Sequence, residues 1–200
     1  MGGAAFTLTV NGSNFQSVSK VQWNGSALTT SYVSGNTLTA SVPAADLASG
    51  GYATVSVVTP APGGGSASAS FAVDYPVPIL SAISPTSAQG GASSVTITAT
   101  GSNFVPVSTI DWNGKALSTS YVSATQLSAS VPAGDLAAGG SIAVTAATPA
   151  PGGGTSSAIT FAVSAPPAAP GGGGGLGMFS LLLLACLNLP WLLAQRRRRA

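Results

Sequence analysis

Short runs of alternating apolar and polar residues fill most of the chain before residue 164. Residues 7–10 (TLTV) alternate in this way, and residues 95–98 (VTIT) repeat the pattern. Such runs are bounded by Gly, Pro, Asn and Ser, and no stretch before the C-terminal tail keeps a helical period. Alternation with a period of two is typical of half-buried β-strands. The pattern therefore predicts an all-β chain of many short strands.

The chain contains two copies of one unit. Three motifs recur at a constant offset of 89 positions, and they are GSNF at 12–15 and 101–104, WNG at 23–25 and 112–114, and SYVS at 31–34 and 120–123. Self-similarity at a fixed period marks a repeated structural unit. We therefore expect two domains of one fold, over residues 1–75 and 76–164.

An Asn-Gly pair in each copy predicts a tight hairpin, at residues 24–25 and again at 113–114. A type I′ turn needs positive φ at both central positions, which Asn and Gly tolerate best. Many short strands joined by tight turns indicate an antiparallel β-sandwich in each copy.

Further segments of the second copy form a more specific pattern. The copy opens with PILSAISP at 78–85 and a Gly-Gly pair, carries GSNF and then IDWNG at 110–114, and closes with Phe-Ala-Val at 161–163. In this combination it resembles the IPT/TIG domain, an immunoglobulin-like fold of plexins and transcription factors. The resemblance implies two tandem immunoglobulin-like antiparallel β-sandwiches. It implies no single function, because one fold serves many functions.

The first copy has no counterpart of this opening segment. With the offset of 89, Met1 corresponds to Gly90, so nothing matches the strand that contains Ile79, Leu80 and Ile83. A sandwich without its first strand leaves unpaired backbone groups at a sheet edge. We therefore expect a first sandwich that is truncated at its N-terminus, and we expect residues upstream of Met1 in the native protein.

The composition changes abruptly after the second copy. Residues 165–175 are a linker of Pro, Ala and Gly only, and residues 176–194 carry no charge. A helix of roughly 17 to 25 apolar residues crosses a bilayer, and a cluster of basic residues is retained on the cytoplasmic side. We expect a transmembrane helix over 176–194, a basic cytoplasmic tail over 195–200, and both repeats outside. The orienting residues are Arg196, Arg197, Arg198 and Arg199. A buried core helix or a disordered basic tail is the alternative.

The order of glycine run, apolar segment and arginine cluster resembles the GlyGly-CTERM sorting signals of Gram-negative bacteria. The glycine run consists of Gly171, Gly172, Gly173, Gly174 and Gly175. The resemblance implies that a rhomboid-like sorting protease removes the tail; without cleavage the tail is a permanent anchor. Either route requires export, yet residues 1–5 lack the basic start and apolar core of a signal peptide.

Charged side chains are scarce. They make up 5% of the chain, which has no histidine and no glutamate. General acid–base catalysis favours His or a tuned Glu, so we predict that the chain is not an enzyme and needs no cofactor. Outside the tail the basic residues are Lys20 and Lys115, against four aspartates. The sequence therefore has no row of basic side chains to bind the phosphates of a nucleic acid.

Two repeated pairs of residues are candidates for binding. Asp46 and Asp135 occupy equivalent loop positions; calcium needs several carboxylates together, so we interpret them as caps of a short helical turn and predict no metal site. Trp23 and Trp112, accompanied by Tyr32 and Tyr121, form flat platforms for sugar rings if they are exposed. If they are buried, they belong to the hydrophobic core. We favour core packing and keep aromatic contact as the alternative.

The sequence as a whole indicates a non-catalytic cell-envelope protein, presented outside the membrane, whose repeats are spacers or adhesion modules. The alternatives are a polysaccharide-binding module and accessory repeats of an enzyme whose catalytic domain lies upstream. The expected partners are the membrane, the rhomboid-like protease, and a polysaccharide or another surface protein.

Overall fold

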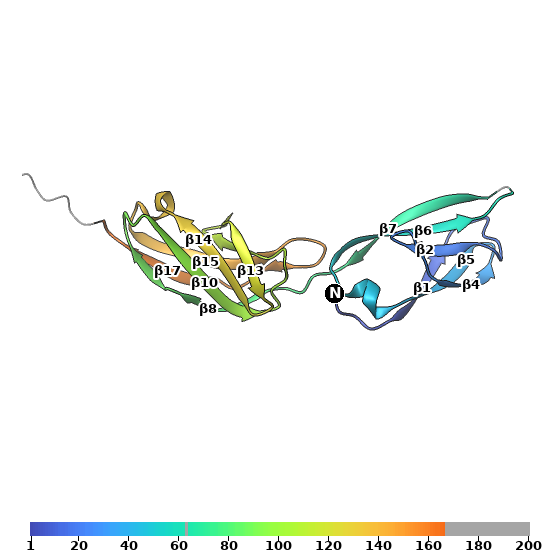
Figure 1. The fold of residues 1–200 in the computed structure, drawn as a ribbon, viewed down its shortest axis with the longest axis horizontal. Helices are drawn as coiled ribbons and strands as arrows, with labels where there is room; N and C mark the ends of the chain where they lie inside the picture. The colour runs from blue at the N-terminus through green and yellow to red at the C-terminus, as the bar shows by residue number, and fades with distance from the viewer. Residues whose placement is uncertain (63, 167–200) are drawn as a thin grey trace, which may run out of the picture. The chain divides into compact units, whose positions relative to one another are not determined.

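The computed structural model describes residues 1–62 and 64–166. This part folds as two β-sandwiches, one built from β1–β7 and the other from β8–β17 (Figure 1). The prediction of an all-β chain with two tandem immunoglobulin-like sandwiches is confirmed. In the described ranges no helix has the length and apolarity needed to cross a membrane. The predicted helix over 176–194 lies outside these residues.

The first sandwich pairs a three-stranded sheet, in the order β1-β5-β4, with a four-stranded sheet, in the order β3-β2-β6-β7. Every strand pair in it is antiparallel. Its elements are β1 (Phe6–Asn11), β2 (Lys20–Trp23), β3 (Ser26–Ala27), β4 (Thr29–Ser34), β5 (Thr37–Val42), the 3-10 turn η1 (Ala44–Leu47), β6 (Gly51–Thr59) and β7 (Gly65–Val73).

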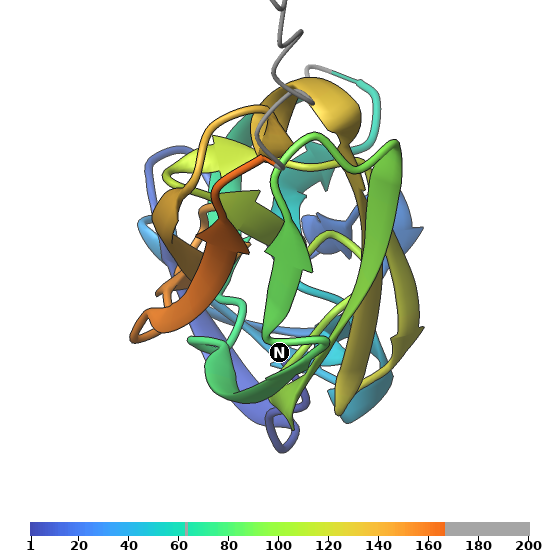
Figure 2. The ribbon, with the colours of Figure 1, turned by 90° about the vertical axis from the view of Figure 1, so that its left-hand side faces the viewer.

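The second sandwich has the same plan with additional strands. One sheet has the order β13-β14-β10-β8 and the other β12-β11-β15-β17-β9, with β16 beside β15. In Figure 2 the orange strand β17 and the green strands β8 and β10 lie in different layers. Its elements are β8 (Ile79–Ser84), β9 (Ser87–Gln89), β10 (Ser94–Ser102), β11 (Thr109–Trp112), β12 (Lys115–Ala116), β13 (Thr119–Ser123), β14 (Gln126–Pro132), the 3-10 turn η2 (Ala133–Leu136), β15 (Gly140–Thr148), β16 (Gly154–Thr155) and β17 (Ile159–Ser164).

Both predicted Asn-Gly hairpins are present. Asn24 has φ 48° and Gly25 has φ 85°, while Asn113 and Gly114 have φ 50° and 82°. These values are the left-handed pair that a type I′ turn requires. The turns join β2 to β3 and β11 to β12, so each Trp-Asn-Gly motif places its tryptophan at the end of a strand.

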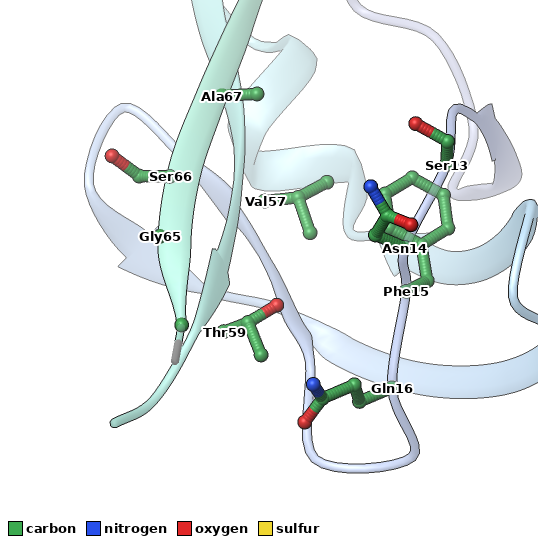
Figure 3. Close-up of a pocket in the computed structure, with 10 residues that line it drawn as sticks. Ser13, Asn14, Phe15, Gln16, Val57, Thr59, Gly65, Ser66 and Ala67 are labelled. Carbon is green, nitrogen blue, oxygen red and sulfur yellow. The ribbon is translucent and has the colours of Figure 1, made fainter. Parts of the chain in front are cut away.

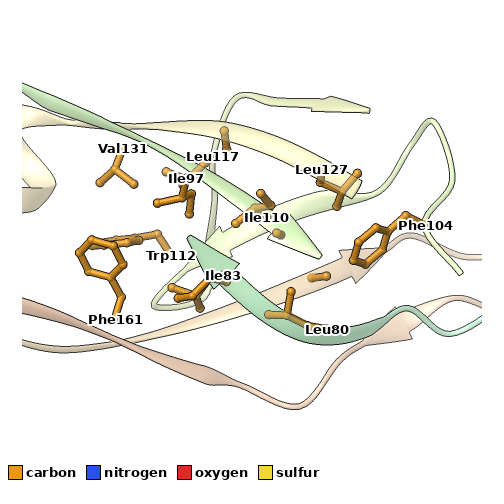
Figure 4. Packing of buried hydrophobic residues seen from close by; sticks show 14 of the residues in the cluster. Leu80, Ile83, Ile97, Phe104, Ile110, Trp112, Leu117, Leu127, Val131 and Phe161 are labelled. Atoms are coloured by element: carbon orange, nitrogen blue, oxygen red, sulfur yellow. The ribbon is translucent and has the colours of Figure 1, made fainter. Parts of the chain in front are cut away.

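The core of the second sandwich lies between its two sheets. Apolar side chains from both sheets meet there (Figure 4), and among them are Leu80, Ile83, Ile97, Phe104, Ile110, Trp112, Leu117, Leu127, Val131 and Phe161. The ring centroids of Trp112 and Phe161 are 4.9 Å apart in an edge-to-face arrangement. Burial of these side chains is the main favourable contribution to folding, because apolar surface leaves water.

The first sandwich has a corresponding but less complete core. Its buried members are Val21, Trp23, Leu28, Leu38, Ala40, Val42, Leu47, Ala53, Val55, Val57 and Val73. Leu8 and Val10 of β1 are only half-buried, whereas their counterparts Ile97 and Ala99 of β10 are fully buried. The burial differs because, among the described residues, no strand of the first sandwich corresponds to β8 or β9.

A pair of hydroxyl groups is repeated inside both sandwiches. The oxygens of Ser19 and Thr59 are 2.7 Å apart, and those of Ser108 and Thr148 are 2.8 Å apart. Ser108 Oγ also accepts a hydrogen bond from the Val105 N–H at 3.0 Å. Buried polar groups need such partners, because an unpaired one is costly. The offset of 89 relates these residues, but sequence analysis did not single them out.

The capping interpretation of Asp46 and Asp135 is wrong in its detail. Both lie within the expected short helical turns, η1 and η2, but the N-cap positions are held by Pro43 and Pro132, and neither turn has a side-chain cap hydrogen bond. An N-cap side chain must precede the turn in order to reach its free amides. Each aspartate is the third residue of its turn. A side chain there can cap only through the N–H of the N-cap residue, which is absent because Pro43 and Pro132 are prolines.

Candidate functional site

Trp23 and Trp112 lie inside the sandwiches. Their exposed fractions are 3% and 4%, and Trp23 packs against Phe71 with ring centroids 5.1 Å apart. A sugar platform needs an exposed ring face, which neither indole offers. Their burial supports the core-packing interpretation.

The tyrosines that accompany these tryptophans are on the surface. Tyr32 is 45% exposed on β4, and Tyr121 is 39% exposed on β13. The next residue in each copy, Val33 or Val122, is exposed as well. Each sandwich therefore presents a tyrosine and a valine side by side on an edge strand of its β5 or β14 sheet.

A β-bulge follows each tyrosine, in an edge strand in which most residues are exposed. The pairing of β4 with β5 shifts between Tyr32 and Ser34, and that of β13 with β14 shifts between Tyr121 and Ser123. In a regular strand successive side chains alternate between faces. Tyr32 keeps this register opposite the buried Leu38, and Tyr121 keeps it opposite the buried Leu127, so the tyrosines are exposed because their strands lie at the sheet edge. The extra residue of a bulge breaks this alternation, and bulges often re-aim side chains near functional sites. We name this repeated feature the Tyr-Val bulge.

A second candidate site is hollowed into the side of the first sandwich. Two adjoining hollows, each of about 320 Å³, share Phe15, Val57 and Ala67 as lining residues, and Figure 3 draws the hollow that also includes Gln16 and Thr59. One of them extends along Val10 and Gly12 of the β1 side to Val55 and Ala69 of the opposite sheet. We name the two hollows together the lateral groove. Its floor is apolar, with a rim of serines, Asn14 and Gln16.

The same side of the second sandwich is closed. There β8 pairs with β10 in one sheet, and β9 then pairs with β17 in the other. Strand β8 also contacts β15 and β17 across the core. Leu80 and Ile83 of β8 are buried, and so is Phe104, the counterpart of Phe15. Phe15 itself is only half-buried. The lateral groove is therefore the space that β8 fills in the second sandwich.

Metal-binding clusters are missing from the described part of the chain. No group of three or more His, Cys, Asp or Glu side chains lies close enough there to hold an ion. The two remaining groups of predicted site residues, the glycine run 171–175 and the arginines 196–199, lie outside the described residues.

A sequence profile described as the IPT/TIG domain matches the chain twice, over residues 2–74 and 78–163. The two matches correspond to the two sandwiches. No curated protein matches the chain in sequence.

Several solved structures resemble the chain at low identity. SGBP-B of the Bacteroides ovatus mixed-linkage glucan utilization locus, solved in complex with a mixed-linkage heptasaccharide, is 22% identical with a TM-score of 0.33. This alignment covers 80% of the present chain but only 42% of that protein. The amphioxus IgVJ-C2 molecule is 15% identical over 81% of this chain and 97% of its own, with a TM-score of 0.36. A 1.5-MDa bacterial ice-binding adhesin is 20% identical over 81% and 56%, with a TM-score of 0.30.

Proposed function

Because this chain belongs to the IPT/TIG domain family, we propose that it is a non-catalytic cell-envelope protein whose repeats serve as spacer or adhesion modules outside the cytoplasm. The observation that carries the proposal is the tandem arrangement of two immunoglobulin-like sandwiches ahead of a tail with a glycine run, an apolar segment and four arginines. A sorting protease of the rhomboid type removes this tail or, failing that, the tail anchors the chain.

The surface of the sandwiches supports a binding or spacing role over catalysis. Their titratable side chains are few, and the described aspartates gather into no cluster. The features that recur in both sandwiches are structural: the Asn-Gly hairpins, the hydroxyl pairs and the tryptophan cores. At the surface of the described residues, the Tyr-Val bulge and the exposed valines Val18 and Val107 are also repeated.

Mass-spectrometric mapping of the C-terminus, on protein isolated from its own cell envelope, tests sorting. We expect a C-terminus within residues 171–175. A chain that retains Arg196–Arg199 and ends at Ala200 would refute the sorting proposal. Protease treatment of intact cells should also release peptides of the two sandwiches. If release occurs only after lysis, the repeats are not outside.

A polysaccharide-binding module is the second candidate, and the Tyr-Val bulge favours it. Aromatic side chains bring large apolar area with a polar hydroxyl at low entropic cost, which suits contact with sugar rings. The bulge is retained at the same position of both repeats, where a purely structural edge could carry any polar residue.

Binding of soluble glucans by the intact chain tests this candidate. Tyr32→Ala and Tyr121→Ala should together weaken binding at least tenfold, which corresponds to about 1.4 kcal/mol. Tyr52→Ala is the matched control, because Tyr52 is 68% exposed while its counterpart in the second sandwich is Ser141. Equal loss in the control and the double variant, or no glucan binding at all, would reject the polysaccharide hypothesis.

A further inference from the structure

We propose that the lateral groove binds an extended peptide strand with the chemistry of residues 78–85, supplied from outside residues 1–73. The strand adds antiparallel to β1 and inserts two aliphatic side chains between the sheets. This site is independent of the Tyr-Val bulge and of the fate of the tail.

The second sandwich supplies the template for the occupant. There β8 runs antiparallel to β10, with Ala99 opposite Ile83 and Gly101 opposite Leu80. A bulge between Thr100 and Gly101 removes one residue from the pairing, so that two side chains three positions apart, Leu80 and Ile83, both turn into the core. The occupant is therefore a strand with aliphatic residues at this spacing and small residues between them.

The partner strand in the first sandwich is β1 with the turn that follows it. The offset of 89 relates residues 98–102, which pair with β8, to residues 9–13. In the described structure β1 pairs only with β5, so its other edge is open. An open edge presents a row of unpaired N–H and C=O groups, to which an extended peptide can add by main-chain hydrogen bonds.

Gly12 keeps the backbone of this edge accessible. A Cβ atom on its counterpart Gly101 would lie 1.9 Å from the carbonyl oxygen of Ile79, so only glycine permits the approach of β8. Gly12 retains this allowance in a sandwich that has no such strand among its described residues. A Cβ on Gly12 would also meet the Phe15 ring, 2.5 Å away, just as one on Gly101 would meet Phe104.

The opposite wall of the groove is apolar and uncovered. On β7 the odd-numbered side chains point between the sheets, and Phe71 and Val73 pack there. Ala67 and Ala69 continue the same face, yet both are exposed because nothing lies over them. Inserted Leu and Ile side chains would cover these alanines together with Val10 and Phe15, and burial of one such side chain contributes roughly 1.5–3 kcal/mol.

Hydrogen exchange of the intact chain, measured by mass spectrometry with the synthetic peptide PILSAISPTS (residues 78–87), tests the proposal. At a peptide concentration about 100 times Kd, exchange through opening of the first sandwich should slow about 100-fold. Slowing should include β1, while β10 is unchanged because its own β8 already covers it. A peptide with Leu80→Asp and Ile83→Asp is the matched control and should not bind.

Variants of β7 test whether the peptide binds in the lateral groove. Ala69→Trp fills the space for one aliphatic side chain and should weaken peptide binding at least tenfold, since it removes about 1.4 kcal/mol or more of burial. Ser70→Trp is the control, because Ser70 is exposed on the other face of the same strand and does not line the groove. Unchanged exchange of β5 in both variants verifies that the sandwich remains folded.

Three results would overturn the proposal. The first is that the Asp-substituted peptide binds as tightly as PILSAISPTS. The second is that Ala69→Trp and Ser70→Trp weaken peptide binding equally. The third is a dimer, seen by sedimentation at rising protein concentration, that protects β1 and that the peptide does not dissociate. In that case a second copy of this chain occupies the edge instead of a peptide strand.

Discussion

Single residues with left-handed backbone set the turns of both sandwiches. Besides the two Asn-Gly pairs, Asn14 and Asn103 have φ values of 60° and 62°. These asparagines precede Phe15 and Phe104, so the GSNF motif reverses the chain and directs a phenylalanine toward the core. Asn tolerates this conformation better than most residues do, because its short polar side chain can hydrogen-bond locally.

Replacement of a turn glycine by alanine should isolate the free-energy cost of the left-handed backbone conformation. We expect Gly114→Ala to destabilise the second sandwich by about 1–2 kcal/mol, the cost of a left-handed alanine. No atom lies within 4 Å of a Cβ at Gly114 or at Gly134, and only Gly114 has a positive φ. Gly134→Ala is therefore the control and should be neutral or slightly stabilising. Urea unfolding of each variant, followed by tryptophan fluorescence, measures the difference, and equal effects would contradict the prediction.

At the scale of elements, the strand β8 is the main difference between the two sandwiches. It belongs to one sheet, and the chain then crosses to the other sheet as β9, so a single segment closes the whole side. The first sandwich shows the same core without this closure, and half-buried Leu8, Val10 and Phe15 are the result. One strand thus decides whether an immunoglobulin-like sandwich presents a groove or a closed flank.

Truncation of β8 side chains should open the second sandwich in the same way. Leu80→Ala is expected to cost about 2–5 kcal/mol, because it removes a buried side chain and leaves a cavity. Ile79→Ala is the control on the same strand, since Ile79 is 53% exposed and Leu80 only 7%. Hydrogen exchange of β10 should accelerate in the first variant and stay unchanged in the second. Similar acceleration in both would mean that β8 acts through its backbone alone.

At the scale of the whole molecule, the described chain consists of two sandwiches of unequal completeness. The second has β8 and β9 in addition, and its core includes Leu80, Ile83 and Phe104, whose counterparts in the first are absent or half-buried. Each sandwich has its own core, so each can open without the other. Stability should follow the completeness of the core and of the edges.

We therefore expect the first sandwich to unfold before the second. In a urea series followed by hydrogen exchange, the amides of β1, β5 and β6 should lose protection at a lower concentration than those of β10, β14 and β15. The peptide PILSAISPTS should raise the urea midpoint of the first sandwich and leave that of the second sandwich unchanged, because a ligand of the native state stabilises only the domain that binds it. Coincident transitions without peptide would contradict this order.

Much of the fold was predictable because its signals are local. Alternation identified the strands, Asn-Gly identified the hairpins, and the offset of 89 identified the two domains and the missing counterpart of Ile79–Ser84. The aspartate caps were mispredicted because the sequence alone did not fix where η1 and η2 begin: prolines hold the N-cap positions and offer no N–H to a third-position carboxylate. The hydroxyl pairs were missed because their members are 40 residues apart.

The sequence by itself determined the repeat, the strand pattern, the turn chemistry and the tail's composition, since each depends on residues close together in the chain. Only the tertiary structure decided which aromatic residues are buried and which are exposed. Trp23 and Tyr32 are both candidate platforms in the sequence, but packing on Phe71 buries the first, and the position of β4 at the sheet edge exposes the second. The lateral groove likewise exists only where two sheets face each other without a strand between their edges, a relation between segments far apart in the sequence.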